Sequence, residues 1–292
     1  MQRWHMVSFV RPAAVALGLA FGVYFVFTSP YQGAKLWPVW APLAVAFTGA
    51  AGAVFAYGID RWFELTGCGE VSVRVRDAVP RVAAIGIVSA LVLAGSTRLR
   101  GPVHSSWRHV ALVGAGLLGS VTVALVMEAI RHVAGSLPAA GTRGEQAALL
   151  VRLRQLLQRL LAATGSVVAL STLAVGASVT LERDLAAQSG DATATGLPPQ
   201  FALIFGGLGS LLVALFYIPA ASALQRRGRR LCDELFPLGK ADEASAVLGV
   251  AEDRHRLEQL LEVDRSVATD LQTGLAVLGP LIASAAATFL SP

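Results

Sequence analysis

Long uncharged stretches alternate with short charged segments along the whole chain. Each stretch is rich in small and aliphatic residues and contains no Asp, Glu, Lys or Arg. The stretches are 12–34, 36–59, 82–97, 110–127, 160–181, 201–224 and 271–292. Because about 20 apolar residues suffice to cross the hydrocarbon core of a bilayer as a helix, the pattern predicts an all-α integral membrane protein with seven transmembrane helices.

The composition agrees with a membrane protein. Apolar residues make up 54% of the chain and charged residues only 15%, whereas soluble domains carry about 25% charged residues. Seven spans leave room for short connecting segments only, so residues 1–292 are expected to form a single transmembrane helical domain. The net charge of +5 lies next to the span ends. Anionic lipid headgroups attract basic side chains at the ends of the spans. We therefore expect contact with anionic lipids and no nucleic-acid binding.

The basic residues predict the orientation. With the N-terminus inside, 19 of the 24 Lys and Arg residues fall in inside segments. The five on the other side are Lys35, Arg98, Arg100, Arg108 and Arg183. The positive-inside rule therefore predicts a cytoplasmic N-terminus and an external C-terminus. Arg greatly outnumbers Lys, and Ala and Gly are abundant, as in GC-rich coding, so we expect the plasma membrane of a bacterium.

One loop departs from this charge distribution. The loop 97–109 carries three of the five exceptions, and the stretch before it, 82–97, would be only about 24 Å long as a helix. If 82–97 and 110–127 formed a hairpin that re-entered without crossing, 22 basic residues would lie inside and two outside. Re-entrant pairs are uncommon and 110–127 is long enough to cross. Seven crossings are therefore the prediction, with the hairpin as the alternative.

Two spans are expected to continue into the cytosol as helices. Leucines follow one another at spacings of four, three and four residues in 145–160, which is typical of a coiled coil. They are Leu149, Leu153, Leu156 and Leu160. No helix-breaking residue separates this segment from the fifth span, so the sequence predicts one continuous helix over about 145–181.

The sixth span predicts a similar extension. It contains Pro219, where a kink is expected because proline removes an intrahelical hydrogen bond. Beyond Pro237 a further helix is predicted at about 241–264, with a favourable i,i+4 pair between Glu252 and Arg256. The cytosolic helical elements are therefore expected at about 143–160 and 224–265.

One short segment has the pattern of a strand. Residues 70–77 alternate valines with polar side chains, which is typical of a half-buried strand. We find no second strand in the sequence to pair with it. An extended loop and pairing with another chain both remain open.

The chain carries little that indicates catalysis. No span has an ionisable residue near its middle, where such residues usually mark ion or proton paths. Glu128, near the inner end of the fourth span, comes closest, and Arg131 at i+3 can pair with it. The histidines lack metal-ligand spacing, and no phosphate-binding loop follows the span ends. We therefore expect a protein that is not an enzyme and that binds no metal or cofactor.

Small and hydroxyl residues are the positive signals inside the spans. Glycine pairs such as Gly18 and Gly22 let helices approach closely, within one chain or between subunits. In the fifth span, Thr164, Ser171 and Ser178 follow one another at intervals of seven residues. Their hydroxyls can bond to backbone carbonyls in a packed interface, or they can line a narrow wet path. Both interpretations remain open.

Two functions are compatible with these features. The first is a homo-oligomeric membrane assembly, such as a channel or pore, with helix 145–181 near the symmetry axis and its hydroxyls facing the lumen. The alternative is a membrane anchor or scaffold whose cytosolic helices dock a soluble protein partner. Six arginines are candidate contacts for such a partner or for lipid headgroups. They are Arg226, Arg227, Arg229, Arg230, Arg152 and Arg159.

Overall fold

The computed structural model describes residues 2–29, 31–67, 79–87, 106–136, 142–189, 200–237 and 244–263. The regular elements in these ranges are all helices, which are α1 Gln2–Phe27, α2 Trp37–Gly67, α4 Ser106–Ser136, α5 Arg143–Ser189, α6 Gln200–Leu235 and α7 Ala244–Leu260. Residues 79–87 are also helical. Within this part of the chain the prediction of an all-α protein is confirmed.

Four of these helices are long and apolar enough to cross a membrane. The qualifying segments are Trp37–Thr66, Gly114–Ser136, Arg143–Glu182 and Gly206–Leu235. The apolar part of α1, Arg11–Phe27, is shorter than these. The stretch 271–292, most of 82–97 and the alternating segment 70–77 lie outside the described residues. A membrane-type helical bundle is therefore supported, and seven crossings stay a prediction.

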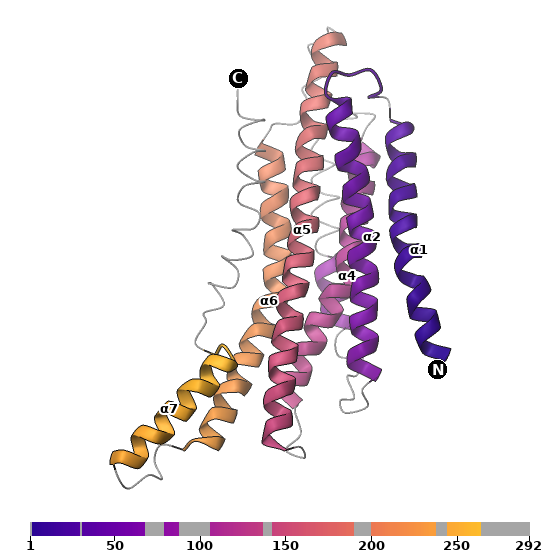
Figure 1. The fold of residues 1–292 in the computed structure, drawn as a ribbon. Coiled ribbons are helices and arrows are strands. Elements are labelled where there is room, and N and C mark those ends of the chain that lie inside the picture. The colour runs from indigo at the N-terminus through magenta and orange to yellow at the C-terminus, as the bar shows by residue number, and fades with distance from the viewer. Residues whose placement is uncertain are drawn as a thin grey trace.

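The long helices stand side by side in one bundle (Figure 1). The N-terminus of α1, the C-termini of α2 and α6, the start of α5 and all of α7 lie toward one end of it (Figure 1). Arginines gather at this end, which we call the basic end and define by Arg11, Arg61, Arg131, Arg152 and Arg227. The charge asymmetry of the sequence therefore corresponds to one end of the folded bundle.

Glycines set the close contact between α1 and α2. Gly18 and Gly22 on α1 both lie against Thr48 of α2, and Gly52 of α2 lies against the carbonyl of Ala14. A Cβ at any of the three would collide with these neighbours. Since higher numbers on one helix face lower numbers on the other, the two helices are antiparallel. These glycines therefore serve packing within one chain.

The same kind of contact shows that α2 and α4 run in the same direction. Gly116 faces Phe47, Gly119 faces Ala51, and Thr122 donates to the carbonyl of Phe55 at 2.9 Å. Numbers rise together on the two helices, so α4 begins at the end opposite to the basic end. Residue 81 nevertheless lies beside Glu128, about 33 Å along α4 from its first residue. The choice between a crossing and a re-entrant hairpin falls on residues 88–105, which lie outside the described residues.

The fifth predicted span is part of one long helix, as expected. α5 has 47 residues, about 70 Å at the helical rise. A capping box begins it, because the backbone N–H of Glu145 donates to Thr142 Oγ1 at 3.3 Å and that of Thr142 to Glu145 Oε2 at 2.9 Å. The helix continues to Ser189, past the predicted end at 181, because good helix formers (Glu, Arg, Leu, Ala and Gln) hold six of these eight positions before Gly190.

The sixth span also continues beyond its uncharged stretch. α6 includes Pro219 without ending there, and its lower part leans away from α5 (Figure 1). α7 confirms the further helix predicted at 241–264, and its Arg256–Glu252 pair is present at 2.7 Å. The basic end is thus built of helices that extend past the apolar segments.

Two glycines on α4 provide a test of the packing. A Cβ at Gly119 would meet the Ala51 carbonyl oxygen at 2.7 Å, whereas a Cβ at Gly114 would meet nothing within 4 Å. We expect Gly119→Ala to lower the free energy of unfolding by about 1 to 3 kcal/mol, because backbone atoms cannot give way. Gly114→Ala should leave it unchanged or raise it by up to about 1 kcal/mol. Reversible unfolding in mixed micelles, followed by circular dichroism, measures both, and equal effects would contradict the assigned α2–α4 interface.

Candidate functional site

Ion pairs between helices gather at the basic end. Those among α1, α2, α5, α6 and α7 are Arg11–Asp60 (α1 to α2), Glu64–Arg152 (α2 to α5), Arg143–Glu234 (α5 to α6), Arg254–Asp233 (α6 to α7) and Arg154–Glu262 (α5 to the turn after α7). Each pair joins a different combination of elements, so together they link five helices. The Glu258 carboxylate, and after it Asp233, raise the pKa of Arg254, so this link stays charged at every physiological pH.

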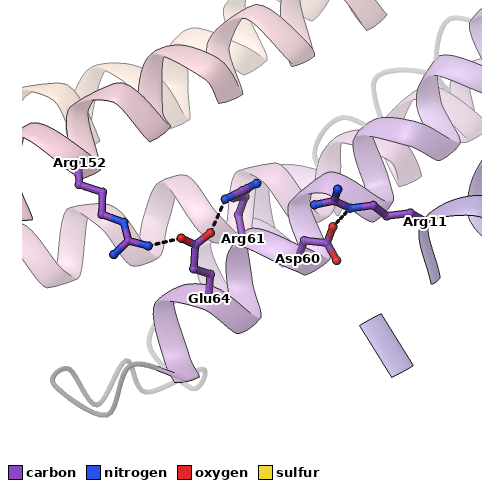
Figure 2. Close-up of polar contacts among 5 residues, drawn as sticks. All are labelled: Arg11, Asp60, Arg61, Glu64 and Arg152. Carbon is purple, nitrogen blue, oxygen red and sulfur yellow. Dashed lines mark hydrogen bonds and ion pairs between the residues drawn. The ribbon is translucent and has the colours of Figure 1, made fainter. Parts of the chain in front are cut away.

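Two of these pairs lie next to each other at the end of α2. Figure 2 shows Arg11 reaching Asp60, and Glu64 lying between Arg61 and Arg152. Asp60 directly follows the uncharged stretch 36–59, and its side chain is buried. A buried carboxylate requires a cation close by, and Arg11 of α1 supplies it. The pair therefore fixes α1 to α2 where the apolar part of α2 ends.

Glu128 is the most deeply buried acidic side chain in the described part of the chain, at 1% exposed. Arg131 lies 2.7 Å from it, Arg81 of the segment 79–87 lies 3.3 Å away, and His132 lies 3.5 Å away. The predicted pair with Arg131 is confirmed. The second arginine was not predicted, because it comes from a segment 47 residues away. Two cations around one carboxylate indicate a structural ion cluster.

The hydroxyl residues of α5 belong to a longer buried row. Every third or fourth residue of the helix from Leu150 to Leu181 is at most 7% exposed. This row, which we call the α5 seam, consists of Leu150, Leu153, Leu157, Leu160, Thr164, Val167, Ser171, Ala174, Ser178 and Leu181. Its spacing alternates between three and four residues without a break, which is a heptad repeat. Helices α2, α4 and α6 of the same chain pack against α5.

Hydrogen bonds within α5 occupy the three predicted hydroxyls. Thr164 donates to the Leu160 carbonyl at 2.8 Å. Ser171 and Ser178 donate to carbonyls three residues earlier, each at 2.7 Å. A hydroxyl bonded to its own helix can be buried without a partner on another helix. All three side chains are therefore buried, with each hydroxyl bonded to its own helix.

The buried row at the start of α5 contains two of the four predicted leucines. Leu153 and Leu160 lie in the α5 seam as expected, but Leu150 and Leu157 take the places predicted for Leu149 and Leu156. Leu149 and Leu156 are half-buried and line a pocket between α5 and α2. Because leucines occupy both 149 and 150, and both 156 and 157, either member of each pair could belong to the buried row. Packing against neighbouring helices decides which member is buried.

The four arginines of α6 divide into two kinds. Arg227 is partly buried, where it donates to Gln146 Oε1 at 3.2 Å and lies 3.7 Å from Glu234. Arg226, Arg229 and Arg230 are exposed, and within the described residues they form no ion pair. Only these three are therefore available for an outside contact.

The exposed arginines continue a lipid-facing side of α6. Leu208, Leu211, Leu215 and Ile218 are exposed at helical spacing along its uncharged stretch. Arg226 and Arg229 follow Leu215 and Ile218 by about three turns, which returns them to the same face. A face that is apolar through the bilayer and basic at its boundary suits contact with anionic headgroups.

The two α5 arginines line a partly open pocket of about 120 Å³ at the basic end. Arg152 and Arg159 share this pocket with Arg61 and Glu64 of α2. Sequence reasoning missed the two α2 residues, although a signal was present. Arg61 follows one uncharged stretch and Arg159 precedes another, so antiparallel helices bring them to the same level.

Neither a metal site in the described residues nor a known relative assigns a function to this chain. Within the described ranges, no group of three or more His, Cys, Asp or Glu side chains could hold a metal ion. The chain matches no known protein family, no curated protein and no solved structure. Its function must therefore be inferred from its own residues.

A double-mutant cycle tests the Glu128 cluster. Arg131→Met should lower the free energy of unfolding by about 1 to 3 kcal/mol, because it leaves a buried carboxylate with less compensation. Glu128→Met combined with Arg131→Met should cost less than the sum of the two single changes, because the charge needing compensation is then gone. Unfolding in mixed micelles measures all three variants.

The exposed pair on α7 supplies the control. Arg256 and Glu252 have the same chemistry, at i,i+4 instead of i,i+3 spacing, but are both largely exposed. Arg256→Met should therefore change the free energy of unfolding by less than about 0.5 kcal/mol. Strict additivity at Glu128 and Arg131 would show that the cluster carries no coupling.

Proposed function

We propose that this protein is a non-catalytic multi-pass membrane anchor whose cytosolic helical extension docks a soluble protein. The basic end would face the cytoplasm of a bacterial cell, as the positive-inside rule indicates. The observation that carries the proposal is the set of ion pairs that joins α1, α2, α5, α6 and α7 beyond the apolar segments. They hold together a helical surface that projects past the apolar segments.

The outer side of α7 is the surface that we assign to the partner. α7 and the lower part of α6 project to one side of the bundle (Figure 1). Arg254 and Leu257 face α6 and the core, whereas Glu252, His255 and Gln259 are exposed at helical spacing on the other side. These polar side chains suit a partner that binds reversibly from solution.

The burial of the α5 hydroxyls supports the anchor over the channel that the sequence also allows. The channel hypothesis assigned Thr164, Ser171 and Ser178 to a lumen, and all three are buried against helices of their own chain. The exposed faces of α1 and α6 are apolar, and Leu17, Leu211 and Ile218 are exposed on them. Such faces suit contact with lipid.

Ion flux separates the two functions. Reconstituted in liposomes of bacterial lipids, the wild-type protein should give no ion flux above that of empty liposomes. The reason is that the hydroxyls of the α5 seam are buried between helices and line no water-filled path. Flux that Ser171→Leu or Ser178→Leu abolishes, while each variant remains folded, would overturn the anchor proposal and support a pore.

Site-specific photo-crosslinking tests docking directly. A photoreactive residue at Glu252, His255 or Gln259 in cells should give a discrete adduct with a soluble protein. The control position is Leu17, which is 71% exposed on α1 and should face lipid. Adducts absent from all three α7 positions, or equally abundant at Leu17, would contradict the proposal.

A further inference from the structure

The pocket between α2 and α5 lies at the boundary between the apolar segments and the basic end. Arg61 lies two residues after the uncharged stretch 36–59, and Arg159 lies directly before the stretch 160–181. Both line the same pocket. Arg152 lies two turns further from the membrane, about 10 Å at the helical rise. The pocket therefore extends from the level of lipid headgroups into the aqueous region.

The pocket carries more positive charge than its own carboxylate can compensate. Glu64 is shared between Arg61 and Arg152, one carboxylate oxygen for each (Figure 2). Arg159 forms no ion pair with any described residue. The Nε of Arg61 is buried and finds no acceptor in the same part of the chain. Three guanidinium groups and one carboxylate leave an excess of two positive charges.

We propose that this pocket binds the phosphate group of an anionic ligand through Arg61, Arg152 and Arg159. A phosphate presents several acceptor oxygens, and the planar guanidinium group matches them in pairs. Its charge balances the excess in the pocket. Glu64 acts as an internal competitor, because it occupies donors of Arg61 and Arg152 that the phosphate would use.

The size and walls of the pocket fit this ligand. A volume of about 120 Å³ holds several water molecules, since about 10 to 15 Å³ suffices for one, and a phosphate group can replace them. Leu65, Leu149 and Leu156 form apolar walls beside the arginines. A phosphate next to apolar surface at the membrane boundary is the arrangement of a lipid headgroup, and basic pockets between helices bind such headgroups. A free phosphate or a soluble phosphate ester has the same chemistry.

A competition experiment tests the proposal and separates the two sources. The full-length protein in a neutral detergent is titrated against a fluorescent short-chain phosphatidic acid, and binding is followed by anisotropy. We expect saturable one-site binding. Displacement by unlabelled phosphatidic acid but not by inorganic phosphate or phosphatidylcholine assigns the site to a lipid headgroup. Equal displacement by inorganic phosphate assigns it to a soluble phosphate. Absence of saturable binding overturns the proposal.

Three variants make the test specific. Arg159→Gln should weaken binding by about tenfold or more, because a charge-assisted hydrogen bond is lost. Glu64→Gln should tighten binding by up to about fivefold, because it removes a competitor worth a surface ion pair. Arg256→Gln removes the same charge from an exposed position on α7, outside the pocket and away from the lipid-facing side of α6, and should leave the affinity unchanged.

A purely structural role for these residues predicts a different result. If Glu64 only joined α2 to α5, Glu64→Gln would weaken binding by loosening the pocket. That result, or equal effects of Arg159→Gln and Arg256→Gln, would overturn the proposal. Circular dichroism of each variant checks the fold. Because the pocket does not involve α7, failure of this test would leave protein docking unaffected, and the reverse also holds.

Discussion

The packing of one face of α5 against α2, α4 and α6 is the interaction on which the described structure depends. The α5 seam runs about 46 Å from Leu150 to Leu181 and stays buried throughout. Its composition changes at the predicted membrane boundary, with leucines before residue 161 and mostly Thr, Ser, Ala and Val after it. In water, buried leucines supply the driving force. In lipid that force is absent, and small side chains permit the close approach that holds helices together.

This continuous seam explains how one helix can serve both environments. The same heptad register faces the same neighbours on both sides of the boundary, so α5 needs no break. The ion pairs then lie around the seam at the basic end, where water and headgroups can solvate their exposed edges. Arg152 illustrates the division, because it lies one residue from the buried Leu153 and is itself 64% exposed. Burial therefore holds the bundle, and charges define its boundary and its outward contacts.

Local features of the sequence predicted local features of the structure. The continuity of α5 and the pairs Glu128–Arg131 and Glu252–Arg256 depend on residues within four positions of each other, where helix geometry alone decides. The contacts of Arg81 with Glu128 and of Arg11 with Asp60 could not be predicted, because they depend on which helices become neighbours. The α5 seam was within reach of the sequence. Leu150 and Leu157 continue the seven-residue series of Thr164, Ser171 and Ser178, and this series, read as a whole, indicates one packed row.

The most direct test of this account is the accessibility of the α5 seam to water. In a variant without the native cysteines, Ser171→Cys or Ser178→Cys is reconstituted in liposomes and treated with a small hydrophilic methanethiosulfonate reagent. Arg229→Cys, at an exposed position, serves as the reactive reference. We predict that the two seam cysteines remain unmodified in the folded protein and react only after unfolding. Modification of either in the folded protein at a rate near that of Arg229→Cys would show that the seam faces water, and would contradict the account.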